Sequence, residues 1–194
     1  MPEIEDVLAS LTGFPSVCGL PNGDIMDWIE TFLLSCGADV QRIAGDEPGR
    51  SSLFARIGPA APGGIVLSAH ADVVPVTGQD WSSDPFVLTR RGDRLYGRGS
   101  SDMKGFLACM LRLARRCDSC PAPLQRPLYL AVSHDEEIGC LGVRSLLRAI
   151  QSDPDLRAAS CIIGEPTGMQ VAVAHKGKIA FEIRCHGQAA HSAN

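Results

Sequence analysis

Apolar residues recur at helical intervals in four parts of the chain. Residues 3–12 and 24–37 each have such a stripe, and a glycine follows or closes each of them. From Met103 to about Arg116, the run FLACMLRLARR predicts a third helix with an apolar face and a basic end. GVRSLLRAI predicts a fourth helix, which SDPDL ends. The pattern therefore predicts helices in the first, third and last quarters of the chain.

Short apolar runs between these helices predict strands. ADVQRIA and SSLFARIG are joined by the turn GDEPGR, whereas IVLSA, RPLYLAVS and SCIIGE are runs typical of buried strands. Alternating strands and helices indicate an α/β fold, with a sheet covered by helices. Residues 71–93, which include DWSSDPF, are predicted to be a long ordered loop. Ligands of such sheets collect at the carboxyl ends of the strands.

Composition and charge narrow the class of protein. The 194 residues carry a formal net charge of -4, so no basic surface indicates a nucleic-acid or anionic-membrane partner. No apolar run approaches the ~18 residues of a membrane span, and MPEIEDVLAS does not resemble a secretory signal. We therefore expect a cytoplasmic protein with reduced cysteines. Cys117 and Cys120 form a C-x-x-C that we interpret as a surface loop.

Three of the strand-like runs end in side chains that can bind a metal ion. IVLSAH ends at His70, LYLAVSHDEE ends at Glu136 and Glu137, and SCIIGE ends at Glu165. The glycine-rich LYGRGSSDMKG carries Asp102. Such groups at the ends of buried strands are costly to place without a partner. One imidazole and several carboxylates together suit a metal ion, so the set predicts a metal site.

Asp72 and the adjacent glutamates suggest further roles beyond metal binding. Asp72 lies two positions after His70, on the same side of an extended segment, where it can orient the imidazole or bind metal itself. Of Glu136 and Glu137, one can bind a metal while the other accepts a proton. Ordinary structural interpretations stay open. His70 and Asp72 could be a surface pair, Glu136 and Glu137 could lie in a solvated turn, and Asp102 could be a helix N-cap. A nucleotide-binding loop is disfavoured because the G-x-x-x-x-G-K-[ST] spacing is absent.

Five ordered motifs resemble those of a known family. SAHADVVP, GRGSSDMKG, DEEIGCLG, GEPTGM and AAHSA closely resemble the acetylornithine deacetylase and succinyl-diaminopimelate desuccinylase family of dinuclear zinc amidohydrolases. The resemblance covers the chain from about residue 10 onward, and DWSSDPF and GEPTGMQVAVAHKGK look most like the acetylornithine deacetylases. It implies a three-layer helix–sheet–helix catalytic domain with a mostly parallel, mixed sheet over residues 1–175. Residues 176–194 would begin an α+β lid domain.

The resemblance also implies metal ligands. A complete site would hold two zinc ions, for which cobalt could substitute. His70, Asp102 and Glu165 would bind one ion, and Asp102 would bridge to a second ion that Glu137 also binds. Asp72 would orient His70. The bond between Asp102 and Met103 would be cis.

The implied reaction is the hydrolysis of a small N-acyl amino acid, N2-acetyl-L-ornithine, to L-ornithine and acetate. Glu136 would be the general acid and base. His191 would reach the active site of the partner subunit in a homodimer and stabilise the oxyanion. His134, His175 and His186 have no metal role in this resemblance, and we interpret them as structural or surface residues.

Family members are about twice as long as this chain, which leads us to expect a fragment that lacks a later histidine of the second zinc site. Such a fragment would bind at most one zinc ion well and would be weakly active or inactive. Within the family, the alternatives are a desuccinylase and a broader N-acyl-amino-acid deacylase. A non-catalytic metal-binding remnant is the alternative from another functional class.

Overall fold

The computed structural model of the chain describes residues 3–152, 156–177, 179 and 181–187. Four helices lie in these ranges, close to the predicted positions: α1 (Ile4–Thr12), α2 (Gly23–Leu34), α3 (Lys104–Asp118) and α4 (Leu141–Gln151). None of these helices is long and apolar enough to cross a lipid bilayer.

The main sheet has five strands in the order β1-β2-β6-β3-β7. The strands are β1 (Asp39–Ala44), β2 (Ser51–Ile57), β3 (Gly64–His70), β6 (Leu128–Ser133) and β7 (Ala158–Ile163). β2 pairs antiparallel with β1 and β6, whereas β3 pairs parallel with β6 and β7. Four strands therefore run in one direction and β2 opposes them, which confirms the mostly parallel, mixed sheet.

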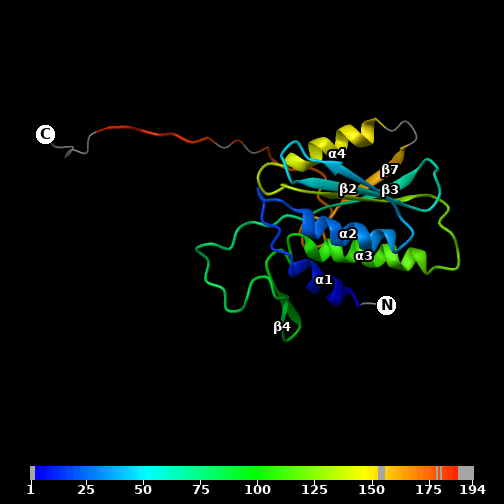
Figure 1. Cartoon of the computed structure of the whole chain (residues 1–194), viewed down its shortest axis with the longest axis horizontal. Helices are drawn as coiled ribbons and strands as arrows, with labels where there is room; N and C mark the ends of the chain where they lie inside the picture. The colour runs from blue at the N-terminus through cyan, green and yellow to red at the C-terminus, as the bar shows by residue number, and fades with distance from the viewer. Residues whose placement is uncertain (1–2, 153–155, 178, 180, 188–194) are drawn as a thin grey trace.

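Helices cover the two faces of this sheet unequally (Figure 1). α2 and α3 lie on one face, α1 packs against α3, and the larger apolar core fills this side. On the other face α4 packs on β1, β2 and β6 over a smaller cluster of Phe54, Tyr129, Ala131 and Leu146. The three-layer helix–sheet–helix fold is thus confirmed.

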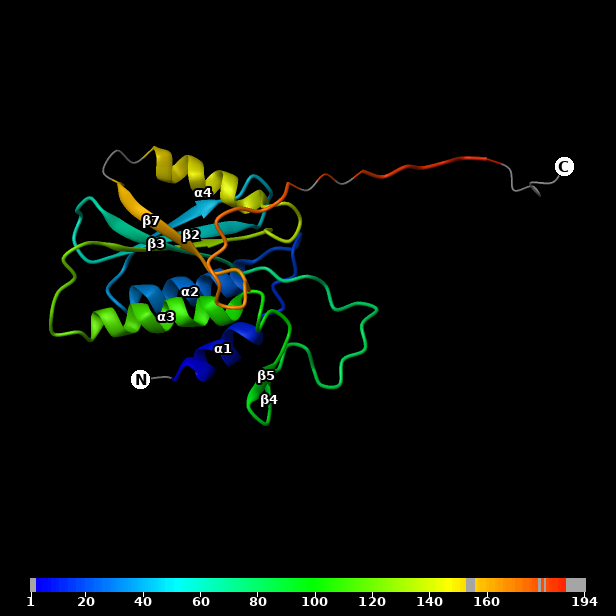
Figure 2. The same cartoon turned by 180° about the vertical axis from the view of Figure 1, so that it is seen from behind.

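Two local predictions were wrong. Residues 71–93 are not irregular throughout, because β4 (Thr89–Arg91) and β5 (Arg94–Tyr96) form a small antiparallel hairpin away from the main sheet (Figure 2). Each strand has only three residues, too few to give an alternating pattern. The run SCIIGE is not buried: every residue of β7 is exposed, and β7 pairs with β3 alone at the sheet edge.

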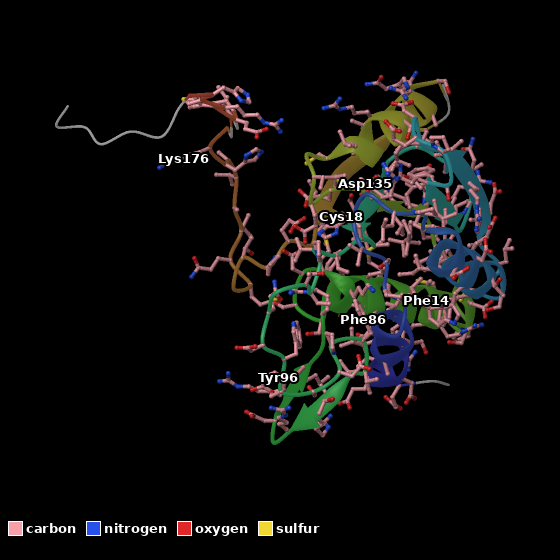
Figure 3. All side chains as sticks on the ribbon, turned by 60° about the vertical axis from the view of Figure 1, so that its left-hand side comes forward. Phe14, Cys18, Phe86, Tyr96, Asp135 and Lys176 are labelled. Atoms are coloured by element: carbon pink, nitrogen blue, oxygen red, sulfur yellow. The ribbon has the colours of Figure 1, made fainter. Side chains whose placement is uncertain are left out.

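The segment after β7 leaves the sheet. In residues 171–177, 179 and 181–187 the chain forms neither helix nor strand and is exposed, and Lys176 lies apart from the body of the structure (Figure 3). The lid domain implied by the resemblance would begin with strands, but none is observed in these residues, because a strand needs a hydrogen-bonded neighbour and no described segment pairs with them. The division into domains at residues 175 and 176 stays a prediction.

Candidate metal centre

The candidate site forms where the parallel strands end. β3 and β6 pair in a register that sets His70 opposite Ser133, so the residues that follow both strands meet at one edge. The backbone N–H of Gly164 donates to the carbonyl of Ser68 at 3.2 Å, which brings Glu165 to the same edge. The predicted meeting of these strand ends is therefore observed.

The His70 ring is the centre of the cluster. It is 2% exposed, and its Nε2 lies 3.0 Å from Asp102 Oδ1. The same nitrogen lies 3.9 Å from Glu136 Oε2 and 3.9 Å from Glu165 Oε1. One possible ligand set joins His70, Asp102 and Glu137, and another joins His70, Glu136 and Glu165, each with ligand atoms within 4.8 Å of one another. All five predicted side chains are thus gathered at one place.

Asp72 orients His70 in a different way from the one expected. The His70 Nδ1 lies 2.9 Å from the backbone carbonyl oxygen of Asp72 and 3.5 Å from its Oδ1. The carboxylate instead accepts hydrogen bonds from the backbone N–H groups of Glu136, at 3.1 Å, and Glu137, at 3.2 Å. Asp72 is therefore a link between the two strand ends as well as a partner of the imidazole.

The N-terminus of α3 supplies Asp102. The peptide bond between Asp102 and Met103 is cis, as the resemblance implied. The N-cap of α3 is Met103, so the alternative interpretation of Asp102 as a helix cap is wrong. The Asp102 carboxylate points to His70 instead, and the buried Met103 sulfur accepts a hydrogen bond from the His70 backbone N–H at 3.3 Å.

Carboxylates outnumber the imidazole, and the pKa shifts reflect this imbalance. Burial alone would lower the pKa of His70, but its hydrogen bond and charge attraction with Asp72, and then its contact with Asp102, raise it to about 9. Burial, followed by repulsion from Asp102, raises the pKa of Glu137. Burial also raises the pKa of Glu165. A divalent cation would relieve this repulsion, so the donor set fits a metal ion.

The donor chemistry is compatible with zinc. Zinc accepts imidazole nitrogen and carboxylate oxygen, which are the donors that His70 and the surrounding carboxylates would supply. The two geometric sets differ from the implied division of ligands, because Glu136 rather than Asp102 accompanies Glu165. The division of ligands between two ions stays a prediction.

His134, His175 and His186 belong to neither possible ligand set, and His191 lies outside the described residues. His134 is buried, 3% exposed, whereas His175 and His186 are exposed. His191 lies outside the residues that the structure describes, so its role stays a prediction.

Three buried or half-buried residues near the site were not identified from the sequence: Arg50, Lys104 and Asp135. Asp135 is 1% exposed and pairs with Arg50, and Lys104, the first residue of α3, is fully buried. A buried carboxylate directly before Glu136 was visible in the motif DEEIGCLG, but nothing in the sequence indicates its partner 85 positions away.

Comparison with known proteins agrees with this geometry. The profile of Peptidase family M20/M25/M40 matches residues 66–193. Acetylornithine deacetylase of Shigella sonnei is 35% identical over 204 aligned residues, which cover 100% of this chain and 51% of that protein. The chain thus spans about half the length of this curated relative.

Solved structures share the fold. An M20 family metallo-carboxypeptidase of Sulfolobus solfataricus, Sso-CP2, aligns with a TM-score of 0.73 at 24% identity, over 84% of this chain and 37% of that one. Human carnosine dipeptidase 1 aligns with a TM-score of 0.71 at 22% identity, over 82% of this chain and 38% of that one. With a matched profile over most of its length and a ligand cluster at the expected strand ends, the chain belongs to peptidase family M20/M25/M40, a family of metallohydrolases.

Proposed function

We propose that the protein is a zinc-dependent amide hydrolase that removes the acetyl group from N2-acetyl-L-ornithine. The observation that carries this proposal is the cluster of four carboxylates around the Nε2 edge of His70, at the ends of β3, β6 and β7. The choice of substrate is supported by the 35% identity to the Shigella sonnei acetylornithine deacetylase. A cytoplasmic location and a homodimer belong to the same proposal.

The proposed site residues have three separate roles: metal binding, proton transfer and positioning. His70, Asp102, Glu137 and Glu165 hold zinc, which supplies a Lewis acid for the amide carbonyl and lowers the pKa of a water molecule. Glu136 is the general base because its carboxylate is partly exposed, 36%, and lies 3.9 Å from the His70 ring nitrogen. Asp72 keeps the Glu136 backbone in place through its carboxylate.

The proton balance follows from hydrolysis. The water oxygen forms a bond to the acetyl carbon, and Glu136 takes one water proton. The C–N bond then breaks, and Glu136 returns this proton to the leaving nitrogen. The second water proton leaves the new carboxylic acid and is taken up by the amine, which gives acetate and ornithine with a protonated amine. Each cycle therefore leaves Glu136 ionised again.

The test uses the purified chain loaded with zinc. Ornithine release from N2-acetyl-L-ornithine should require zinc and should fall ~10²–10⁴-fold in Glu136→Gln, with the zinc content unchanged. N-succinyl-diaminopimelate and N-acetyl-methionine serve as competing substrates. Faster cleavage of either one would replace the proposed substrate. Bound zinc without cleavage of any of the three, both in this chain and in a chain of the full length of its relatives, would favour a non-catalytic metal-binding protein.

A further inference from the structure

We infer that Arg50 and Asp135 are positioning residues of the metal centre, which fix the turn that carries Glu136 and Glu137. This inference rests on the proposed function only for its catalytic consequence. Its structural content concerns residues 134–140, the turn that joins β6 to α4. Arg50 lies just before β2, and neither Arg50 nor Asp135 belongs to the possible ligand sets.

The Asp135 carboxylate is a buried junction between three parts of the chain. Its Oδ1 accepts a hydrogen bond from the backbone N–H of Gly19 at 2.6 Å. Its Oδ2 lies 2.9 Å from Arg50 Nη1 and 3.1 Å from His134 Nδ1. The Asp135 side chain is 2% exposed, so a carboxylate that lost these partners would be buried without compensation.

Arg50 closes the junction into a ring. Its second terminal nitrogen, Nη2, donates a hydrogen bond to the backbone carbonyl of Gly19. The Gly19 residue is therefore held through its N–H by Asp135 and through its carbonyl by Arg50. The guanidinium can do this because it presents two donors in a fixed fork. The loop before α2, the start of β2 and the turn after β6 are joined at one point.

The loop before α2 also contacts the residues that follow β3, because the backbone N–H of Cys18 donates to the carbonyl of Val73 at 2.9 Å. Burial raises the pKa of Cys18, and the negative charges of Asp72, Glu137 and Asp135 raise it further. Figure 3 labels Cys18 and Asp135, which lie near each other beside the end of the sheet. The segment that Arg50 and Asp135 hold therefore contacts the chain directly after Asp72.

The turn itself transmits this constraint to the two glutamates. Asp135 has φ +52°, a left-handed conformation that is unfavourable for residues with a side chain. Its carbonyl accepts a hydrogen bond from Leu141 N–H at 3.0 Å, and the Glu136 carbonyl accepts one from Cys140 N–H at 2.9 Å. These two hydrogen bonds close the turn, and the left-handed conformation of Asp135 sets the direction in which the chain continues. This direction aims the N–H groups of the next two residues at Asp72.

The Arg56–Asp39 pair provides a matched control. Arg56 lies in β2 and also makes a 2.9 Å ion pair, but the Asp39 side chain is 73% exposed. Loss of such an exposed pair has little effect on stability. Arg50→Met and Arg56→Met therefore remove the same charge and hydrogen-bonding group from nearby sites, of which only one holds the turn.

The first measurement is amide hydrogen exchange of the metal-free chain. In Arg50→Met and in Asp135→Asn, peptides covering residues 134–141 should exchange at least tenfold faster than in the wild type, while peptides within β6 should be unchanged. Arg50→Lys keeps the charge but not the two-pronged contact, so it should give an intermediate rate. Arg56→Met should match the wild type within twofold.

The second measurement is zinc affinity by competition with a chromophoric chelator, at a temperature where every variant is folded. Arg50→Met and Asp135→Asn should bind zinc ~10–100-fold more weakly, with partial recovery in Arg50→Lys and no change in Arg56→Met. With cobalt bound in place of zinc, the visible absorption bands of Arg50→Met and Asp135→Asn should also differ from those of the wild type. In a chain that turns over acetylornithine, kcat should fall while KM stays within twofold.

Two results would overturn the inference. One is wild-type exchange and wild-type zinc affinity in both Arg50→Met and Asp135→Asn. The other is exchange that accelerates equally across the whole sheet, since this would make the pair a general stabiliser of the fold. A chain that cleaves none of the three substrates but shows the local exchange and affinity changes would refute the proposed function and leave the positioning role intact.

Discussion

The Asp72 carboxylate accepts a hydrogen bond from the backbone N–H of Glu137 at 3.2 Å, although 65 positions separate the two residues. The other carboxylate oxygen accepts a hydrogen bond from the backbone N–H of Glu136 at 3.1 Å. Burial alone would raise the pKa of Asp72, but its interactions with His70, and then the two backbone hydrogen bonds, lower it. One ionised side chain after β3 thus holds the backbone of the turn after β6.

Asp72→Asn should weaken both the fold and the metal centre. The asparagine amide can accept only one of the two backbone hydrogen bonds, and its NH₂ group would face the other N–H donor. We expect a loss of about 1–3 kcal/mol in the free energy of unfolding and a ~10–100-fold loss of zinc affinity. Urea unfolding of the metal-free chain and chelator competition measure the two effects.

Asp84→Asn is the matched control for this substitution. Asp84 Oδ1 accepts a local hydrogen bond from Phe86 N–H at 2.8 Å, but the residue lies in the loop between β3 and β4, away from the ligand set. Zinc affinity should be unchanged in this variant. If Asp72→Asn bound zinc as tightly as Asp84→Asn does, the proposed link between Asp72 and the metal centre would be wrong.

Zinc binding should release protons and should strengthen as the pH rises. The pKa of His70 is raised to about 9 in the metal-free protein, so below that pH the imidazole must lose a proton before Nε2 can bind a metal. The apparent affinity should rise about tenfold per pH unit between about pH 7 and pH 9 and level off above. Calorimetry in buffers of different ionisation enthalpy should detect about one proton released per ion at the lower end of this range.

His70→Asn separates this effect from the titration of the carboxylates. The variant removes the imidazole, so the affinity that remains should depend much less on pH over the same range. A pH dependence as steep as that of the wild type would assign the released proton to another group. Burial raises the pKa values of Glu137 and Glu165, so a pH dependence that remains in the variant reports these carboxylates.

Gly164 shows how close packing fixes a ligand. A methyl group added at Gly164 would lie 2.0 Å from the Phe106 ring carbon Cγ, far inside contact distance. Gly164→Ala should therefore destabilise the fold by about 1–3 kcal/mol and displace Glu165, which would lower zinc affinity. Thermal unfolding and chelator competition measure both.

A second substitution at Phe106 tests whether its ring is the obstacle to a side chain at Gly164. In a Phe106→Ala background the added methyl has room, so Gly164→Ala should cost less there, with a coupling energy of about 1–2 kcal/mol. Gly23→Ala, at the start of α2, meets no atom within 4 Å and should change stability by less than about 0.5 kcal/mol. Equal costs in both backgrounds would show that the ring of Phe106 is not the obstacle.

Local patterns were sufficient to predict most elements and the five candidate ligands. The apolar runs of β3 and β6 end in polar residues, so strand polarity alone places His70 and Glu136 at one edge. The ligand cluster follows from the parallel register rather than from any long-range signal. The short strand β4 was not predicted, because three residues are too few to show an alternation of apolar and polar positions.

The supporting contacts could not be predicted because they join distant segments. Gly19 N–H and Asp135 Oδ1 are 116 positions apart, and neither residue type indicates the other. The motif LYGRGSSDMKG contains Lys104, but nothing in it indicates that this side chain reaches the carbonyl of Leu11 at the end of α1. Such contacts depend on the packing of complete elements, which a single sequence does not display.

Lys104 should make the stability of the fold depend on pH. Its side chain is fully buried, and Nζ donates to the carbonyl oxygens of Leu11, at 2.9 Å, and Phe14, at 2.7 Å. Burial lowers its pKa to about 7, against the weaker attraction of Asp72. The folded chain then binds fewer protons than the unfolded chain at about pH 7 to 10, so this residue's contribution to stability rises with pH in that range.

Lys104→Met removes both the titrating group and the two hydrogen bonds. Because the buried carbonyls lose their donor, the variant should be less stable than the wild type at about pH 9, by about 2–4 kcal/mol. Between about pH 7 and pH 9 the difference in unfolding free energy between wild type and variant should grow by about 2 kcal/mol. Urea unfolding of the metal-free proteins at both pH values measures this growth. A difference that stays constant would mean that Lys104 keeps its charge in the folded protein, held by the two carbonyls of the α1 end.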